Sequence, residues 1–243
     1  MVKKLGIIKH SYAQPVVSAL RKQTPDSSLR FELVQDVATR LVLKLLQDEL
    51  DGAFLSPIEY AKHSSQLRIV NEICVASTGE SGIIELHFRD DLRNIETLAI
   101  NPEFTSEVIL AKIILAEKFD ISPQLVAVQS LTTDVIHKAD SVLLVGDECV
   151  RWSDHANKLD LVDEWSDMTT MAYVHGFWVT KEGNLSKEPL QTLMTDAPYV
   201  DALQSRDVSY LLDANALSSI EEFYQMSYYH GILKEIPDLI MVE

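Results

Sequence analysis

The clearest strand-to-helix signal in this chain is Gly52-Ala53-Phe54-Leu55-Ser56-Pro57-Ile58-Glu59-Tyr60. Its first four residues form a short apolar run of the length expected for a buried strand. Serine is a favoured helix cap, and proline is preferred in the first turn of a helix. The stretch therefore predicts a strand that leads directly into a helix, with the backbone N–H groups of the helix start beyond the carboxyl end of the strand.

The same alternation continues on both sides of this stretch. Short apolar runs rich in β-branched residues alternate with segments of helical period, which is typical of parallel strands joined by helical crossovers. We expect extended segments at 5–8, 29–34, 52–55, 67–75, 83–88, 98–100, 125–129, 141–145 and 173–180. We expect helices at 14–22, at 37–48 after an Asp36 cap, at 105–119, and throughout the chain after Lys187, with a stop at Gly231. The fold class is therefore α/β.

Two of the longer extended segments divide the chain into lobes. The segments at 83–88 and 173–180 bracket the middle of the sequence, which is the pattern of a lobe inserted into another. We expect one lobe at residues 1–88 plus 180–243 and the other at 89–179. This arrangement predicts two mixed sheets flanked by helices, with a cleft between the lobes.

The composition is that of a folded globular protein, with 47% hydrophobic and 24% charged residues. The net charge of −16 repels phosphate backbones and anionic lipid surfaces, so we expect neither nucleic acid nor a membrane as a partner. Residues 1–8 resemble a buried strand more than a signal peptide, and Cys74 and Cys149 lie in apolar runs. We therefore expect a cytoplasmic protein with two buried thiols. The sequence does not indicate an oligomeric state.

No catalytic or cofactor motif marks the sequence. A Walker A sequence, a GxGxxG fingerprint, an HExxH pair, a CxxC pair and a GxSxG elbow are all missing, and the seven histidines are scattered. We therefore expect no metal and no cofactor. His10, just past the first strand, and His175 are candidates for ligand contact, and the alternative is an ordinary surface or core histidine.

Two strand-to-helix junctions are candidate sites for an anionic ligand. Thr105-Ser106 opens a helix with two hydroxyls and free N–H groups, which suits a carboxylate, although a simple helix cap explains it equally well. Gly146-Asp147 follows a strand and places an acidic side chain at the cleft rim, although Gly-Asp is also common turn chemistry. Because the whole-molecule field repels anions, such a site depends on local donors.

Several stretches in colinear order resemble the chorismate dehydratase family of the futalosine route to menaquinone. They are Leu50 to Ala61, Ile73-Cys74-Val75-Ala76-Ser77, Thr105-Ser106 before Leu110 to Leu115, Leu143-Leu144-Val145-Gly146-Asp147, Asp160 to Trp165, and Phe223-Tyr224 to Leu233. The resemblance covers nearly the whole chain. It implies a two-lobed fold of the type II periplasmic-binding-protein kind, whose cleft takes chorismate and expels water without metal or organic cofactor.

The resemblance also implies where the reacting groups stand. The family's early Tyr-Leu-Asn falls on His10-Ser11-Tyr12, so Tyr12 replaces the asparagine associated with catalysis. The family's serine in a Gly-Pro-Val-x-Ser stretch falls on Ile83, with Ser81 as a shifted hydroxyl, and Gly-Leu-Pro-Phe-Val becomes Thr170 to Val174. We therefore assign catalysis to His10, Ser11 and Tyr12. Substrate binding is assigned to Ser56, Ser81, Thr105, Ser106, Asp147 and Tyr173.

Three functions fit this sequence. The first is a divergent chorismate dehydratase that uses His10, Ser11 or Tyr12 in place of the usual groups. The second is a related enzyme that acts on another carboxylated ring, and the third is a binder of a small organic anion without catalysis. In each case the partner is a small carboxylated molecule.

Overall fold

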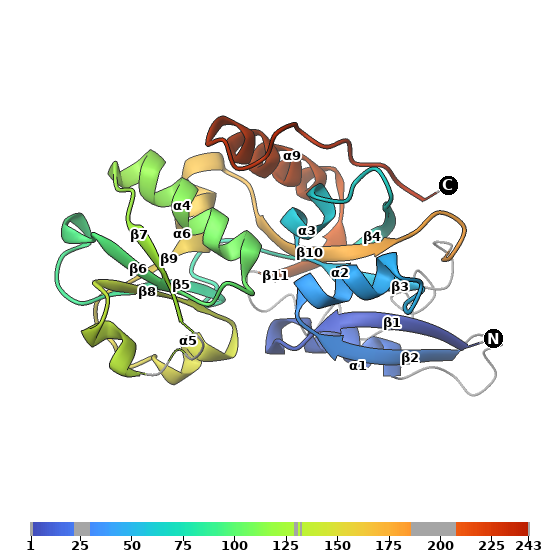
Figure 1. Cartoon of the computed structure of the whole chain (residues 1–243), viewed down its shortest axis with the longest axis horizontal. Helices are drawn as coiled ribbons and strands as arrows, with labels where there is room; N and C mark the ends of the chain where they lie inside the picture. The colour runs from blue at the N-terminus through green and yellow to red at the C-terminus, as the bar shows by residue number, and fades with distance from the viewer. Residues whose placement is uncertain (1, 22–29, 129–130, 132, 186–207, 243) are drawn as a thin grey trace.

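A computed structural model describes residues 2–21, 30–128, 131, 133–185 and 208–242 of the chain (Figure 1). Its strands form two sheets that lie side by side, each with helices packed against it. The α/β fold class with two mixed sheets is confirmed.

The first sheet has six strands in the order β11-β4-β10-β3-β1-β2. Strands β1, β2 and β3 are parallel, whereas β10 runs antiparallel to β3 and β4. Because β1, β2 and β3 are parallel, their carboxyl ends share one edge of the sheet, and Figure 1 shows this edge directed toward the second sheet. The bounds are β1 Val2–Ile8, β2 Arg30–Asp36, β3 Gly52–Leu55, β4 Arg68–Ser77, β10 Tyr173–Thr180 and β11 Val208–Leu212.

The second sheet has five strands in the order β7-β6-β8-β5-β9. Strand β6 is parallel to β7 and β8, and β5 is antiparallel to β8 and β9. The bounds are β5 Ile84–Phe88, β6 Thr97–Ile100, β7 Gln124–Ala127, β8 Ser141–Val145 and β9 Lys158–Asp160.

The pairing of two strands shifts the expected lobe boundaries. The sequence placed 83–88 with the first lobe and most of 173–180 with the second. Instead β5 pairs within the second sheet, and β10 pairs with β3 and β4 in the first. We keep the two-lobe division as a proposal and place its crossings between β4 and β5 and between α6 and β10.

The helices cover the sheets and join them. The α-helices are α1 Gln14–Arg21, α2 Ala38–Leu46, α3 Pro57–Ala61, α4 Thr105–Phe119, α5 Asp147–Arg151, α6 Leu161–Thr169 and α9 Ala214–Tyr229. Three 3-10 turns are η1 Ser11–Ala13, η2 Leu92–Asn94 and η3 Thr133–His137. Helix α4 follows β6 of the second sheet but packs against α3 and α9 of the first lobe as well as against α6. It therefore forms a wall shared by both lobes.

One hydrophobic core runs through both lobes. It contains strand residues of the first sheet, such as Leu5 and Phe54, together with Leu86 and Leu143 of the second. A smaller cluster around Val142 and Trp152 covers the other face of the second sheet. The lobes are thus joined by packed side chains, and a cleft can open only where this core ends.

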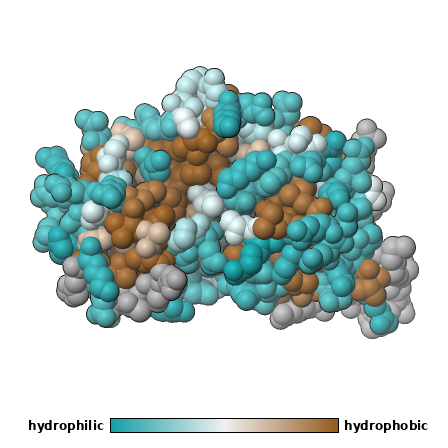
Figure 2. All heavy atoms as spheres, viewed as in Figure 1, coloured by the Kyte–Doolittle hydropathy of each residue, from teal (hydrophilic) through white to brown (hydrophobic). Residues whose placement is uncertain are grey.

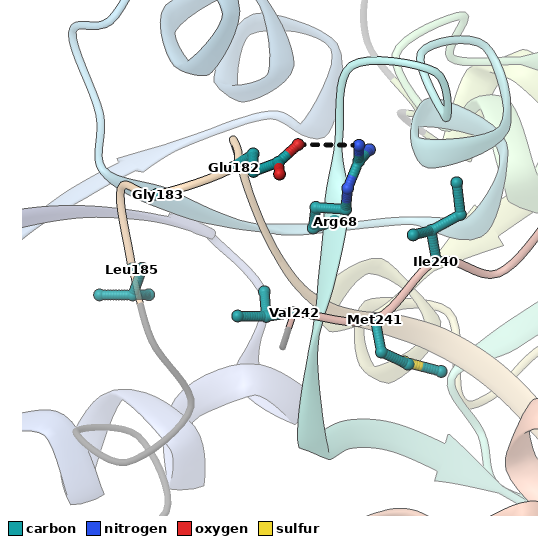
Figure 3. Close-up of a pocket in the computed structure, with 7 residues that line it drawn as sticks. All are labelled: Arg68, Glu182, Gly183, Leu185, Ile240, Met241 and Val242. Atoms are coloured by element: carbon teal, nitrogen blue, oxygen red, sulfur yellow. Dashed lines mark hydrogen bonds and ion pairs between the residues drawn. The ribbon is translucent and has the colours of Figure 1, made fainter.

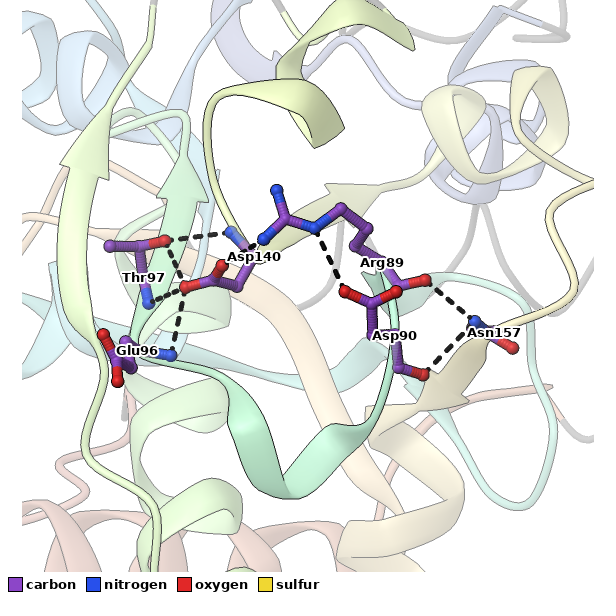
Figure 4. A network of polar contacts seen from close by, with 6 residues as sticks. All are labelled: Arg89, Asp90, Glu96, Thr97, Asp140 and Asn157. Atoms are coloured by element: carbon purple, nitrogen blue, oxygen red, sulfur yellow. Dashed lines mark hydrogen bonds and ion pairs between the residues drawn. The ribbon is translucent and has the colours of Figure 1, made fainter.

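A polar network anchors the start of the second sheet (Figure 4). The carboxylate of Asp140 accepts hydrogen bonds from the backbone N–H groups of Glu96 and Thr97 and from the Thr97 hydroxyl, at 3.2, 2.9 and 2.7 Å. Arg89 pairs with the other carboxylate oxygen at 2.7 Å. The Thr97 hydrogen bond, followed by the backbone bonds, holds the pKa of Asp140 below its usual value. These bonds tie β6 to the segment that enters β8.

Several expected elements differ in the structure. Helix α2 is capped at Val37, and the Asp36 carboxylate, one residue earlier, pairs with Arg40 and Lys44. The expectation of helix throughout the region after Lys187 is wrong in part, because residues 208–212 form β11 at a sheet edge; residues 186–207 lie outside the described part. Gly231 follows the end of α9 with a φ of 66°, as expected for a helix stop.

Figure 2 shows separate apolar patches among hydrophilic side chains on the face drawn. Cys74 and Cys149 are free and buried, as expected. No helix in the described ranges has the length and hydropathy needed to cross a bilayer.

Candidate functional site

A small cavity lies where the carboxyl ends of β1, β2 and β3 meet the start of α4. Its lining comes from the residues after these strands, from β10, and from the first turn of α4. The cavity measures about 40 Å³. It is lined by Ile8, Lys9, His10, Tyr12, Val37, Ala38, Ser56, Glu103, Phe104, Glu107 and His175. Both lobes contribute to the lining, and we refer to the cavity and its lining as the cleft.

Aromatic rings fill most of this cleft. The His10 ring stacks on Tyr12 with a centroid distance of 5.3 Å and an interplanar angle of 6°. Phe104 of the second lobe lies 5.3 Å from His10, and Tyr12 lies 5.2 Å from His175. Tyr173 continues the row at 5.2 Å from His175. The rings present flat apolar faces, which suit a cyclic ligand.

Polar atoms without hydrogen-bond partners gather in the same place. Among the described residues, Ser56 Oγ, Tyr173 Oη, His175 Nδ1 and His10 Nδ1 are buried and unpartnered. The first three belong to residues with exposed fractions of 6%, 1% and 1%. Leaving a buried polar group unpaired costs about 1 to 3 kcal/mol, so such atoms mark a place prepared for another hydrogen-bonding molecule.

Both imidazole rings of the cleft are held neutral. Burial, and to a smaller extent the nearby His10, lower the pKa of His175 to about 3. His175 Nε2 lies 2.6 Å from the Ser77 hydroxyl, which fixes the ring, while Nδ1 is buried without a hydrogen-bond partner. Burial also lowers the pKa of His10, against the opposing charge of Asp147. Neutral imidazoles act as bases or as hydrogen-bonding groups, not as cations.

An acid completes the lining. Glu107 in the first turn of α4 has an exposed fraction of 5%. Burial, followed by the charge of Glu59, raises its pKa to about 7. A carboxyl group with this pKa is about half protonated at pH 7, whereas an ordinary glutamate is ionised.

The structure brings some of the sequence-predicted residues together and separates others. His10, Tyr12 and Ser56 line the cavity, and Tyr173 borders it through His175. Ser11 is exposed at the start of η1, and Asp147 is exposed at the start of α5. Ser81 lies in the β4–β5 crossing, where its hydroxyl accepts the Ile83 N–H at 3.3 Å, outside the cavity lining.

The hydroxyls of Thr105 and Ser106 are used within the protein. Thr105 donates its only hydroxyl proton to Glu59 at 2.8 Å. Ser106 is fully buried and accepts the Ile58 N–H at 3.0 Å, which ties α4 to α3. Both contacts hold the wall of the cleft in place, and we leave these two residues out of the proposed ligand contacts.

The sequence interpretation missed Glu107, Phe104, Glu103 and Lys9 in the cavity lining. A signal for Glu107 is present in the helical period. Glu107 shares a face with Leu110, Ala111 and Ile114, all of them buried, at spacings of three, four and seven. An acid on the buried face of an apolar helix is uncommon, and it indicates a functional position.

A larger hollow lies at the far end of the first sheet (Figure 3). It measures about 450 Å³ and is lined by Arg68, Glu182, Gly183, Leu185 and residues 240–242. Arg68 pairs with Glu182 at 3.1 Å, and the side chain of Glu182 is 80% exposed. None of the buried unpartnered polar atoms in the described part belongs to this lining. We therefore take the cleft as the candidate functional site. Within the described ranges, no group of three or more His, Cys, Asp and Glu residues is arranged to hold a metal ion.

Solved structures with the same fold include proteins that bind small molecules. Protein AF1704 from Archaeoglobus fulgidus is 15% identical, with a TM-score of 0.69 over 96% of this chain and 98% of that one. The aliphatic sulphonate binding protein of Escherichia coli is 12% identical, with a TM-score of 0.65 over 98% and 95%. The alkanesulfonate-binding protein of Xanthomonas axonopodis pv. citri, bound to MOPS, is 12% identical, with a TM-score of 0.64 over 99% and 96%. These likenesses confirm the periplasmic-binding-protein fold.

A family model described as menaquinone biosynthesis matches residues 3–197. The match includes both sheets apart from β11, and every residue that lines the cleft. It agrees with the resemblance found in the sequence. The chain belongs to the menaquinone biosynthesis family.

Proposed function

We propose that this protein is a divergent chorismate dehydratase that binds a carboxylated ring in the interlobe cleft and eliminates water from it. The observation that carries the proposal is that three buried, unpartnered polar atoms, His10 Nδ1, Ser56 Oγ and His175 Nδ1, belong to residues that line one cavity between the lobes. Membership of the menaquinone biosynthesis family supports a role in that pathway.

Binding of a small molecule is supported by the fold and by the lining. Two of the similar structures are sulfonate-binding proteins, one of them bound to a buffer molecule. In the cleft, hydroxyl groups supply donors for anionic oxygens, and the ring row His10, Tyr12, His175 and Tyr173 supplies a surface for a flat ligand.

The cleft also contains groups for the chemistry. A 1,4-elimination removes a ring proton and releases a hydroxyl group, which leaves as water after it gains a proton. Neutral His10, whose Nδ1 is unpartnered, is the proposed base. Tyr12 stacks on it, and burial raises the pKa of its phenol well above the usual value, so the phenol keeps its proton for donation to the ligand.

Binding requires the cleft to open. A cavity of about 40 Å³ has room for a few water molecules, whereas pockets for small organic ligands measure about 300 to 1,000 Å³. The rings of His10 and Phe104, which face each other from the two lobes, are the side chains that must separate. The proposal therefore includes a lobe movement on binding.

Incubation of the purified protein with chorismate alone tests the proposal. We expect a new enol ether product without added metal or cofactor. His10→Gln should lower kcat by about 100-fold or more, in the range for loss of a general base, while His63→Gln, in the turn after α3, should retain the rate. Unchanged chorismate after prolonged incubation at high protein concentration would contradict catalysis.

A binder without catalysis is the second candidate, and one observation favours it. The positions where the family carries an asparagine and a serine hold Tyr12 and Ile83, and Ile83 is buried outside the cavity lining. This candidate predicts a thermal shift with a carboxylated ring compound and no product. Release of product in the chorismate assay would exclude it.

A further inference from the structure

Glu107 is a buried acid in the cleft, and the proposed function assigns it no role. It lies in the lining together with His10, Tyr12, Ser56 and His175, at the start of a helix that belongs to the other lobe. With an exposed fraction of 5%, its carboxyl group is separated from bulk water. Its place at the wall shared by the two lobes makes it a candidate for ligand contact.

The groups that face Glu107 do not compensate a negative charge. From α3 it meets Glu59, whose carboxylate is already bound by Lys62 at 2.9 Å and by Thr105 at 2.8 Å. From η1 and β10 it faces the phenols of Tyr12 and Tyr173, whose pKa values are raised above the usual value first by burial and then, if Glu107 is ionised, by its charge.

The remaining charged groups around α4 have partners or lie farther along the helix. Glu103 in the same lining pairs with Arg40 at 3.2 Å. Two ion pairs join α4 to its neighbouring helices near its carboxyl end. Glu117 of α4 pairs with His230, which follows α9, and Lys118 of α4 pairs with Glu164 of α6. His10 and His175 are held neutral, Asp147 adds negative charge at the rim, and Lys9 is exposed at the mouth. An ionised Glu107 would therefore stand in the cleft without a buried cation.

We propose that Glu107 is a ligand-recognition residue that stays protonated in the closed cleft and donates its carboxyl proton to an anionic oxygen of the ligand. This inference rests on the proposed function, because it requires the ligand to enter the cleft. A carboxyl–carboxylate hydrogen bond is short and charge-assisted, and it holds an anion without a positive side chain. It explains how a chain with a net charge of −16 binds an organic anion in a pocket with no buried cation among its described lining residues.

The inference makes ligand affinity depend on pH in one direction. The ligand-bound form requires the Glu107 proton, so binding takes up a proton wherever free Glu107 is ionised. Above about pH 7 the affinity for chorismate should fall by about tenfold per pH unit. The Glu107→Gln variant keeps an N–H donor of similar shape but has no titrating proton, so its affinity should not change over the same range.

The first measurement needs no ligand. In the wild-type protein at pH 6.5 we expect the infrared carbonyl band of a protonated carboxylic acid. Asp160, whose pKa burial raises to about 6, adds to this band, so the test is the difference spectrum, wild type minus Glu107→Gln. We expect the band in this difference and not in wild type minus Glu117→Gln, which changes an exposed acid at the other end of the same helix. A Glu107→Gln difference spectrum without the band would overturn the protonated state.

The second measurement is calorimetric titration of chorismate at pH 8 in two buffers of different ionisation enthalpy. We expect uptake approaching one proton per ligand in the wild-type protein and in Glu117→Gln, and none in Glu107→Gln. Tighter binding by Glu107→Gln at every pH would overturn the inference, because it would show that Glu107 repels the ligand. Chorismate and benzoate could both fail to bind although the carboxyl band is present. This result would contradict the proposed function and the hydrogen bond from Glu107 to the ligand, but not the protonation of Glu107.

Discussion

Gly146, at the end of β8 in the second lobe, lies directly against the imidazole ring of His10, which follows β1 in the first lobe. A β-carbon added at Gly146 would lie 2.5 Å from His10 Nδ1, closer than such atoms approach in real structures. Gly146 also has a φ of 63° and a ψ of −121°, a conformation in which glycine predominates. Glycine at this position therefore lets the two lobes close on each other at the cleft.

Gly146→Ala should hold the cleft open. We expect a loss of unfolding free energy of about 1 to 2 kcal/mol from the backbone strain, and at least a tenfold loss of ligand affinity from the clash with His10. Urea unfolding and a chorismate titration measure the two effects.

Gly82→Ala is the matched control, because Gly82 has a similar φ of 65° but nothing within 4 Å of an added β-carbon. It should lose stability and keep its affinity. The double variant with Gly146→Ala and His10→Ala has no clash, so its lobes should close again. Solution scattering detects closure as a decrease in the radius of gyration. If Gly146→Ala and Gly82→Ala behave alike in both measurements, the contact has no role in closure.

His175 should make the protein sensitive to acid. Its folded pKa of about 3 lies below the ordinary value of 6.5, so the unfolded chain binds a proton at a pH where the folded protein does not. Stability from this group is complete above about pH 6.5 and falls as the pH decreases toward 3, by an amount on the order of a few kcal/mol. His175→Gln should cost stability at pH 7, and its deficit should shrink or reverse at pH 4.5 in urea unfolding. A deficit that is the same at both pH values would show that His175 carries its proton when folded.

Trp165 should be a main support of the contact between the lobes. It is fully buried on α6, its indole N–H donates to Ser219 Oγ of α9 at 3.3 Å, and Ser219 donates to the Ala172 carbonyl at 2.5 Å. Trp165→Ala should lower the unfolding free energy by about 3 to 5 kcal/mol. Trp165→Phe keeps most of the ring and loses the hydrogen bond, so we expect a smaller loss of about 1 to 2 kcal/mol. Val150→Ala, at a side chain that is 72% exposed, should change it by less than about 0.5 kcal/mol.

Local patterns were enough to predict the elements that lie inside a sheet or along one apolar face. The segments 52–55, 105–119, 141–145 and 173–180 match β3, α4, β8 and β10 residue for residue. A buried strand or helix is recognisable because its sequence is a continuous run of mainly apolar residues. Sheet membership was not predictable in the same way. β5 and β10 are both fully paired strands, and only long-range pairing decides which sheet each of them joins.

Other elements had weaker or overlooked signals. Helix α6 begins at an Asp160 cap that accepts the N–H groups of Val162 and Asp163, a signal that the sequence carries and that our interpretation used only for the family resemblance. β11 at the sheet edge alternates between partly buried and exposed positions over only five residues, too short a pattern to separate from a helix.

Some residues of the candidate site were predictable from the local sequence, and others were not. His10 and Ser56 follow strand ends, and parallel strands bring such residues together, so their meeting followed from the sequence. The burial of Glu107 depends on η1 and β10 packing over a helix of the other lobe, and the engagement of Thr105 and Ser106 depends on α3. Contacts between lobes are not encoded in a local period.

The proposed function requires the ligand to bind between the lobes, at His10 and His175. This binding can be measured by nuclear magnetic resonance of protein labelled in its histidine rings and titrated with chorismate. We predict saturable shifts in the ring signals of both residues with one common dissociation constant, and unchanged signals from His63 and His230, which lie outside the cavity lining. Saturable shifts confined to His63 or His230, or no shifts at any histidine up to millimolar chorismate, would contradict the account.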